Sequence, residues 1–275
     1  MLWLCSEVQL HQCSYLTSII DYFPIGIFMI FIFGINKQAE IIKNRGKQSN
    51  DDKLFAPKWH TIFTEAADDF SYLLTRGYGT TAALQVVGNR YRLTKRQREA
   101  LSRIGCGEPE IKLRQAKELQ ISDLKGQELE IDGFNLLILI ESLLSGAFIF
   151  KARDGLYRDI SSVHGSYRRV AKTEESLLMI GSAINKLEVK HSKWYFDQPV
   201  SNSGRLKTRL YEMSESHGFN WDVELVFDPD KELIKSKEIV ISSDGWILDQ
   251  AERWFNLGAY IINSTHTKPS NILAL

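Results

Sequence analysis

The chain has 275 residues, enough for one large or two modest domains that each bury a core. Hydrophobic residues make up 44% of it and charged residues 25%, proportions that exclude a globally disordered chain and a polytopic membrane protein. The three cysteines, Cys5, Cys13 and Cys106, include no C-x-x-C pair, which argues against a disulfide framework or a zinc knuckle and favours a reducing, cytoplasmic location.

The net charge is zero, but basic and acidic residues are unevenly distributed. Residues 55–126 hold 12 basic and 8 acidic residues, whereas residues 127–275 hold 17 basic and 21 acidic residues. This asymmetry is typical of proteins that hold a polyanion with one part and metal ions with another. We expect three regions: an N-terminal extension with a linker (1–54), a basic helical domain (55–126) and an α/β domain (127–275).

The N-terminal segment 15–35 is strongly apolar. Its uncharged core spans 13 residues from Phe23, fewer than the roughly 20 that a membrane-spanning helix needs. Basic residues begin only at Lys37, so insertion would leave the body of the protein in the cytoplasm. We favour a dispensable hydrophobic extension, or translation from an upstream start codon, over membrane association through residues 15–35. Residues 43–53 are expected to form a polar linker.

Residues 55–120 have the pattern of a small all-α domain. Apolar residues recur there at spacings of three and four, and threonines and glycines mark the helix ends. Three helices are expected: from a Thr64 cap to Gly77, from Thr80 or Thr81 to a break near Gly88-Asn89, and from a Thr94 and Gln97 capping box to Gly105. Short helices with tight turns predict a bundle of the helix-turn-helix kind.

After Gly126, strands alternate with helices. The expected strands are 128–132, 147–152, 193–197, 221–228 and 238–244. The expected helices are 135–146, 173–187 with Thr173 as its cap, 204–218 and 249–258. This alternation predicts a Rossmann-like α/β domain, with a parallel sheet covered by helices on both faces.

Four of the expected strands end in an aspartate. These are Asp132 after ELEI, Asp197 after KWYF, Asp228 after ELVF and Asp244 after IVISS. The carboxyl ends of parallel strands share one edge, where α/β proteins bind their ligands. A single aspartate in such a place is usually a strand terminator or a helix cap. Four together favour a site, and a hard divalent ion, Mg²⁺ or Mn²⁺, would relieve their repulsion.

The DGFNLLI segment at Asp132 resembles the opening of NYN domains, a branch of the PIN-like nuclease superfamily. Residues 55–263 also resemble an uncharacterised archaeal and bacterial family, domain of unknown function 434, with a helical part followed by a PIN-like part. The matching segments are RGY at Arg76, VGNRYRLTKRQREAL at Val87, DGFNLLI at Asp132, DGLYRDISSVHGSYR at Asp154, DQPVSNSGRL at Asp197 and SSDGWILD at Ser242.

The resemblance implies an acidic site that holds one or two divalent ions and activates water against a phosphodiester. It places Asp132 and Asp244 among the metal ligands, with Asp197 as a third. It leaves the fourth acid open among Glu141 on the first helix, Asp154, Asp159 and Asp249. It also implies that Asn135, Ser201 and Ser203 position ligands or a phosphate oxygen.

Basic residues outside the acidic site are candidates for phosphate contacts. They lie around the third expected helix and in the segment 153–169, where Tyr157 and Tyr167 are interleaved as rings that could stack on bases: Arg90, Arg92, Lys95, Arg96, Arg98, Arg103, Arg158 and Arg168. A solvated helix surface and an ordinary loop are the competing interpretations.

Two hypotheses follow. The first is a Mg²⁺- or Mn²⁺-dependent nuclease that acts on RNA. The second is a non-catalytic nucleic-acid-binding or regulatory protein with a degenerate PIN-like fold. The sequence leaves the oligomeric state open, a homo-oligomer included.

Overall fold

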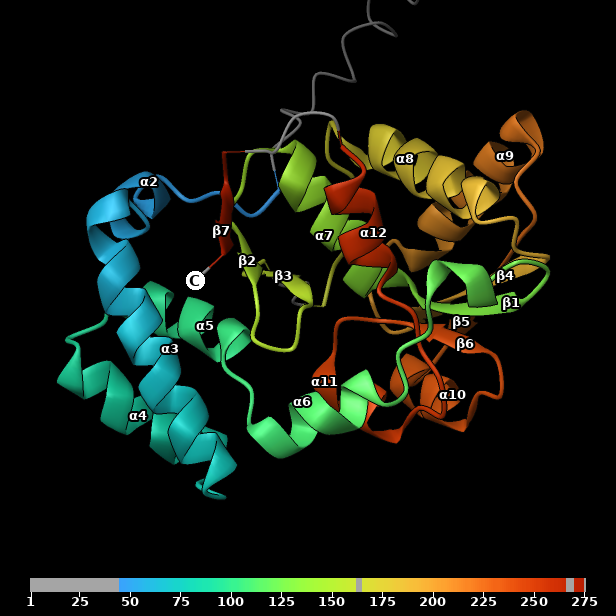
Figure 1. The fold of residues 1–275 in the computed structure, drawn as a ribbon. Coiled ribbons are helices and arrows are strands. Elements are labelled where there is room, and N and C mark those ends of the chain that lie inside the picture. The colour runs from blue at the N-terminus through green and yellow to red at the C-terminus, as the bar shows by residue number, and fades with distance from the viewer. Residues whose placement is uncertain (1–44, 162–164, 266–269, 275) are drawn as a thin grey trace, which may run out of the picture. The chain divides into compact units, whose positions relative to one another are not determined.

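The computed structural model describes residues 45–161, 165–265 and 270–274, so the apolar segment 15–35 lies outside the described residues. The first half of the described chain is helical (Figure 1). Its helices are α2 (Asp51–Leu54), α3 (His60–Thr75), α4 (Thr80–Arg90), α5 (Lys95–Ile104) and α6 (Glu108–Gln115). A capping box between Thr94 and Gln97 begins α5, and Gly105 ends it, as the sequence predicts.

The second half contains the predicted Rossmann-like domain. Its parallel sheet has the order β5-β4-β1-β6, from β1 (Glu128–Asp132), β4 (His191–Asp197), β5 (Trp221–Val226) and β6 (Ile239–Ile241). The connecting helices are α7 (Gly133–Leu144), α8 (Thr173–Lys186), α9 (Ser203–His217) and α10 (Pro229–Lys235), followed by α11 (Gly245–Gln250) and α12 (Leu257–Asn263). After β1, the chain adds β4 and then β5 on one side of the sheet, and β6 then pairs with the other side of β1.

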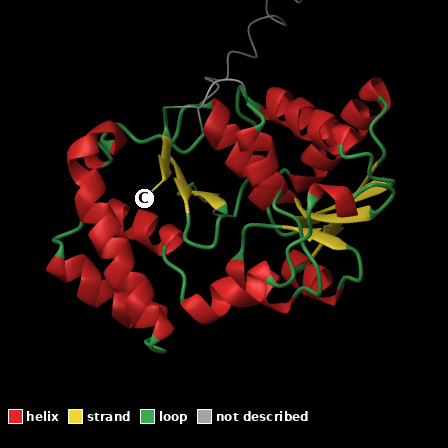
Figure 2. Cartoon of the chain, in the orientation of Figure 1, coloured by secondary structure: helices red, strands yellow, loops and turns green. Residues whose placement is uncertain are grey.

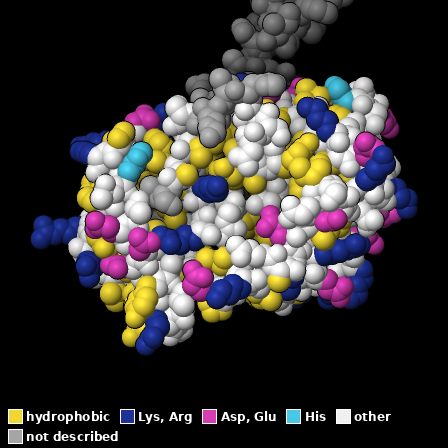
Figure 3. Space-filling view, in the orientation of Figure 1, with side chains coloured by type: hydrophobic (Ala, Val, Ile, Leu, Met, Phe, Trp, Pro, Cys, Tyr) yellow, Lys and Arg dark blue, Asp and Glu magenta, His cyan; other side chains and the backbone are white. Residues whose placement is uncertain are grey.

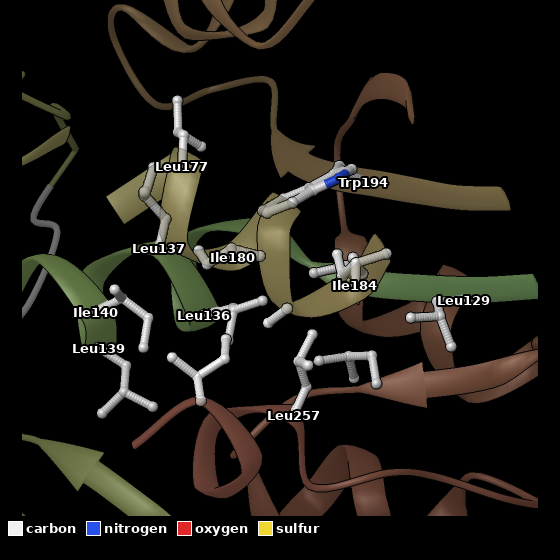
Figure 4. Close-up of a cluster of buried hydrophobic side chains, with 14 of the residues drawn as sticks. Leu129, Leu136, Leu137, Leu139, Ile140, Leu177, Ile180, Ile184, Trp194 and Leu257 are labelled. Carbon is white, nitrogen blue, oxygen red and sulfur yellow. The ribbon is translucent and has the colours of Figure 1, made fainter. Parts of the chain in front are cut away.

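Alternating side chains of the strands bury both faces of this sheet. Trp194 and Phe196 of β4 enter one core, which α7, α8, α9 and α12 complete, whereas Tyr195 enters the opposite core with residues of α10 and α11. Figure 4 shows part of the larger core, where Leu136 and Ile180 extend from two different helices. The sheet is thus the middle layer of three.

A second, smaller sheet lies apart from the first (Figure 2). It has the order β3-β2-β7, from β2 (Ile149–Lys151), β3 (Tyr157–Asp159) and β7 (Ile272–Ala274). The expected strand 147–152 thus exists but does not join the main parallel sheet. Phe150 and Leu273 of this small sheet pack into the core of α3, α4 and α5. The helical part therefore shares its core with the small sheet, one strand of which comes from the end of the chain.

Part of the expected linker is integral to the fold. Asp51 is buried and accepts hydrogen bonds from the Arg96 guanidinium at 3.2 Å. Arg96 also donates to the carbonyl of Gly46 at 2.8 Å. Gly46 has a φ of +78°, and a Cβ there would lie 2.1 Å from the Ser161 hydroxyl. Residues 45–54 thus pack closely against both the helices and the small sheet.

Two predicted helix caps, Thr64 and Thr173, are wrong. Thr64 does not cap α3, because the helix already begins at His60 and the Thr64 hydroxyl donates back to the His60 carbonyl. Helix α4 begins at Thr80 and ends at Arg90, close to the predicted break, and the absent side chain of Gly88 makes room for the Arg98 guanidinium. Thr173 is the first residue of α8 rather than its cap, and its hydroxyl accepts a hydrogen bond from the Val170 amide at 3.1 Å.

The predicted helix 249–258 is also wrong. Helix α11 ends at Gln250 and α12 begins at Leu257. Between them, Trp254 forms a backbone bridge to Val240 of β6, which requires an extended chain. Its ring is fully buried, and its indole N–H donates to the Arg114 carbonyl at 2.9 Å. Tertiary packing of this tryptophan therefore overrides the helical pattern.

Within the described residues, no helix is both long enough and apolar enough to cross a membrane.

Candidate metal centre

The main sheet has one topological switch point. Connections from β1 lead towards β5 on one side and β6 lies on the other, so the crevice between the ends of β1 and β6 is where such sheets bind ligands. Asp132 is the last residue of β1, and Asp244 lies three residues beyond the end of β6. Both are among the predicted metal ligands, for which the sequence also offers Asp197 as a third.

Hydrogen bonds join the two strand ends. Ser242 donates from its hydroxyl to Asp132 Oδ2 at 2.8 Å, and the same hydroxyl accepts from the Asp244 amide at 3.0 Å. Asp132 Oδ1 accepts from the Asn135 amide at 3.3 Å, so Asp132 also caps α7. The carboxylate of Asp132 is therefore held from both sides of the switch point.

Asn135 fixes the turn that carries Asp244. Its side-chain carbonyl accepts from the Ser243 amide at 2.9 Å and from the Ser243 hydroxyl at 2.8 Å. Asn135 thus positions protein groups, and the expected contact with a phosphate stays a prediction. Asp244 itself caps α11 through the Trp246 amide at 2.8 Å and is exposed.

Acidic side chains raise one another's pKa along this edge. Burial raises the pKa of Asp132 to about 7, and the charges of Asp230 and Asp244 add to the effect. Burial and the charges of Asp244, Asp228 and Asp197 raise the pKa of Asp230. Burial, with the charge of Asp228, also raises the pKa of Asp197. This edge therefore favours a proton or a cation.

A cavity of about 320 Å³ opens beside Asp132. Four predicted acids line it, namely the expected ligands Asp132, Asp197 and Asp244, and Asp159 at the end of β3, a candidate for the fourth acid. Arg103, Arg158, Asn135 and Ser243 are among the other residues of its wall. The cavity thus has room for a small ligand beside the acids, between the main sheet and the small sheet.

Glu141, one candidate for the fourth acid, is held inside the larger core. Its side chain is fully buried and accepts hydrogen bonds from Arg45 at 2.8 Å and from the Tyr167 hydroxyl at 2.6 Å. The Arg45 guanidinium also lies 4.9 Å from the centre of the Tyr167 ring. The structure therefore gives Glu141 partners in the core and does not bring it to the cavity.

Asp154 and Asp249 are held by arginines. Asp154 is buried and receives two hydrogen bonds from Arg158, at 2.9 Å and 2.6 Å, and one from Arg114. Burial opposes its ionisation, but the charges of Arg158 and Arg114 outweigh burial and lower the pKa of Asp154. Arg114 also binds both carboxylate oxygens of Asp249, at 2.7 Å and 3.0 Å. Of the four candidates, only Asp159 lines the cavity.

The acids are a loose group in the structure. Among the residues that the structure describes, no three acidic, histidine or cysteine side chains lie close enough together to hold one metal ion. Mg²⁺, however, usually keeps several of its waters and takes one or two carboxylates together with substrate phosphates. The oxygen donors of Asp132 and Asp244 fit such a partial site.

Several predicted basic contacts are engaged within the protein. Arg96 binds Asp51, Arg98 donates to the Leu93 carbonyl at 2.9 Å, and Arg158 binds Asp154. Arg92, Lys95 and Arg168 are exposed, and Arg90 is exposed with an ion pair to Asp69 at 3.4 Å. On the face drawn in Figure 3, basic side chains lie among acidic ones and do not gather into one patch.

The polar and aromatic residues predicted to contact nucleic acid also include both buried and exposed side chains. Ser203 is buried at the start of α9, whereas Ser201 is exposed and pairs through its backbone with Tyr167 and Gly165. The rings of Tyr157 and Tyr167 are buried, which leaves no face free for a base. Direct stacking by these two tyrosines is therefore excluded in this structure.

Asp230 and Ser242 are the site residues that sequence reasoning missed. Asp230 lies in the first turn of α10, which packs against β1. The available signal was a second carboxylate two residues after Asp228, which the structure places two residues beyond the end of β5 and not at the predicted strand end. Ser242 precedes Asp244 in the SSDG turn, but its hydrogen bond to Asp132 spans 110 positions of the chain.

Comparisons with known proteins place the chain among families without an assigned activity. A family model described as a protein of unknown function (DUF434) matches residues 62–117, and one described as a domain of unknown function (DUF5616) matches residues 121–260. The uncharacterized protein MJ0935 of Methanocaldococcus jannaschii is 35% identical over 184 residues, covering 67% of this chain and 88% of that protein. No solved structure matches.

The expected relationship to DUF434 is confirmed for the helical part, and the α/β part has a family description of its own. Neither description names an activity, so a nuclease activity of this chain is a proposal. The chain is a member of the family that carries the domain of unknown function DUF5616, preceded here by a DUF434 segment.

Proposed function

We propose that the protein is a metal-dependent nuclease that hydrolyses RNA at the switch point between β1 and β6. One observation carries the proposal: Asp132, held by Ser242 and Asn135, has its pKa raised to about 7 beside other carboxylates. Such an arrangement costs free energy unless a cation or a proton neutralises it. Perturbed carboxylates in a cavity are a common mark of function.

The roles of the chain's own residues follow from their positions. Asp132 and Asp244 would hold a divalent ion, with Asp230 and Asp197 adding negative charge around it. A bound ion would supply a water of lowered pKa and neutralise charge on the phosphate. Asn135 and Ser242 keep the two aspartates oriented, and Arg103 at the cavity wall would attract a phosphate.

The resemblance of the DGFNLLI segment to NYN domains supports the same activity. In those domains the first aspartate is a metal ligand, and here the matching residue is Asp132 at the end of β1. The strand-helix setting of Asp132 and Asn135 agrees with that role. RNA is preferred over DNA on the strength of this resemblance.

Cleavage of end-labelled single-stranded RNA with Mn²⁺ tests the proposal. Wild-type protein is expected to cut the RNA only with the ion present, and Asp132→Asn should lose the activity. Asp222→Asn is the matched control, because Asp222 is an exposed aspartate on β5 that does not line the cavity. Equal inactivity of wild type and Asp132→Asn on every RNA tried would contradict the proposal.

A second candidate function is nucleic-acid binding without catalysis. The loose spacing of the acids favours it, since no three described ligand side chains can share an ion. This alternative predicts RNA binding of the same affinity with Mn²⁺ and with EDTA, together with no cleavage. The nuclease proposal predicts that Mn²⁺ strengthens RNA binding, because a bound ion would offset the carboxylate charges that repel phosphate.

A further inference from the structure

Two large aromatic side chains stand in solvent at the acidic edge of the main sheet. The side chain of Phe227, directly after β5, is 78% exposed, and that of Trp246, in the first turn of α11, is 53% exposed. Helix α10, which begins two residues after Phe227, packs against α11, which contains Trp246. Each is adjacent to a member of the acidic group.

The backbone positions of both rings are fixed by aspartate caps. Asp244 accepts from the Trp246 amide at 2.8 Å, which sets the start of α11. Asp228, the residue after Phe227, accepts from the Lys231 amide at 3.2 Å and sets the start of α10. The backbone that carries each ring is therefore already ordered, and this lowers the entropic cost of binding a ligand there.

The surroundings of the rings are charged. Phe227 directly precedes Asp228, which is ion-paired with Lys231, and Asp230 follows within the same short segment. The Trp246 amide donates to Asp244. A stable protein interface needs a contiguous apolar centre from which charged residues are depleted. An unpaired nucleobase needs only a flat apolar face, and its edges and phosphate remain in polar surroundings. Isolated rings among charges thus fit bases better than they fit a protein partner.

We propose that Phe227 and Trp246 form a stacking site for unpaired bases of a single-stranded nucleic acid whose phosphate lies at the Asp132 edge. The inference rests on the proposed function and deepens it, because it names the substrate as single-stranded. Bases in a duplex are already stacked on their neighbours and cannot offer a face to either ring. The site would hold bases regardless of their identity, since every base has a flat face.

Binding of a fluorescein-labelled oligoadenylate of about 12 nucleotides, followed by anisotropy, tests the inference on the full chain. Ca²⁺ is present to offset the acidic side chains, and a denaturing gel confirms that the probe stays intact. Trp246→Ala and Phe227→Ala should each raise the dissociation constant by roughly 5- to 100-fold. Trp246→Phe should restore most of the affinity, because it restores a ring.

Tyr78→Ala is the matched control, since Tyr78 is an aromatic residue of similar exposure, 57%, in the turn after α3. It should bind the probe as wild type does, and duplex RNA should bind all variants equally. Affinities of Trp246→Ala and Phe227→Ala equal to that of wild type would overturn the inference, as would no binding by wild type. The rings are exposed, so thermal unfolding should show all variants folded.

Cleavage of the same probe with Mn²⁺ separates this inference from the proposed function. If wild type cleaves the probe and the ring variants bind it normally, the stacking site is wrong and the nuclease stands. If the ring variants bind weakly and wild type never cleaves, the stacking site stands and the nuclease is wrong.

Discussion

Arg158 donates from Nε to the backbone carbonyl of Ser243 at 2.8 Å, so a buried arginine of the small sheet holds the turn that carries Asp244. The same guanidinium donates to the carbonyl of Arg103 at 3.2 Å and to both oxygens of Asp154. Arg158 thus joins the end of α5, the small sheet and the candidate metal centre. It acts on the site through the turn and not by touching a ligand.

Loss of Arg158 should therefore affect stability and site together. Arg158→Gln removes one of the two arginines that neutralise the buried Asp154, and we expect a loss of roughly 3–5 kcal/mol in the free energy of unfolding. Denaturant unfolding measures this loss. Metal affinity should also fall, because the Ser243 carbonyl loses its donor.

Arg90→Gln is the control, since the Arg90 side chain is 70% exposed and its contacts, an ion pair with Asp69 and a guanidinium over the Tyr91 ring, lie at the surface. It should change stability by less than about 0.5 kcal/mol. A stability of Arg158→Gln within that same small range would contradict the structural role assigned to Arg158.

The pKa of Asp132 predicts a pH dependence of stability in metal-free protein. Burial raises this pKa from 3.8 to about 7, so between about pH 4 and pH 7 the folded protein keeps a proton that the unfolded chain releases. The free energy of unfolding therefore falls as pH rises through this window and levels off above it.

Asp132→Asn lacks this titration. Relative to wild type, its free energy of unfolding should gain up to about 4 kcal/mol between pH 4 and pH 8, measured by urea unfolding with EDTA. Asp222→Asn, at an exposed position, should follow the wild-type profile. Parallel profiles of wild type and Asp132→Asn would show that Asp132 ionises normally in the fold.

Close packing of residues 45–54 can be tested at Gly46. Gly46→Ala places a Cβ within 2.1 Å of the Ser161 hydroxyl, which hydrogen-bonds to Ser142, at a backbone φ of +78°. We expect a loss of about 1–3 kcal/mol in the free energy of unfolding. Gly204→Ala, in open space within α9, should be neutral or slightly stabilising. Equal stability of both variants would mean that the segment is only loosely attached.

Glu141 should prove structural. Glu141→Gln leaves the Arg45 guanidinium in the core without its carboxylate, so we expect a stability loss of roughly 3 kcal/mol. The affinity for Mn²⁺, measured well below the unfolding temperature, should not change. A clear fall in metal affinity with little loss of stability would return Glu141 to the list of ligands.

The elements that follow from local pattern were predictable. The strand 128–132 has its predicted bounds, because an alternating pattern ends in Asp132 and a turn. The Thr94 and Gln97 capping box is equally local. Convergence of Asp132, Asp197 and Asp244 on one cavity followed from the rule that parallel strands share an edge.

Features that depend on distant partners were not predictable. The sequence favours a phosphate contact for Arg158, but the structure pairs Arg158 with Asp154, which Arg114 also binds. Arg114 lies 40 positions before Asp154, so the local pattern could not show this group. Trp254 reads as part of a helix until its bridge to Val240 is known. Asp230 joins the acidic edge only because α10 packs against β1. In each case tertiary contacts decide between interpretations that the local pattern leaves equal.

Calorimetric titration of Mn²⁺ tests the central claim, that the acids between β1 and β6 form a divalent-metal site. Wild type should bind Mn²⁺ saturably, and Asp132→Asn, Asp244→Asn and Asp230→Asn should bind it far more weakly. Ser242→Ala should lower the affinity roughly 10- to 100-fold through its lost bond to Asp132, and Asp222→Asn should not change it. No saturable binding by wild type, or equal binding by wild type and Asp132→Asn, would contradict the claim.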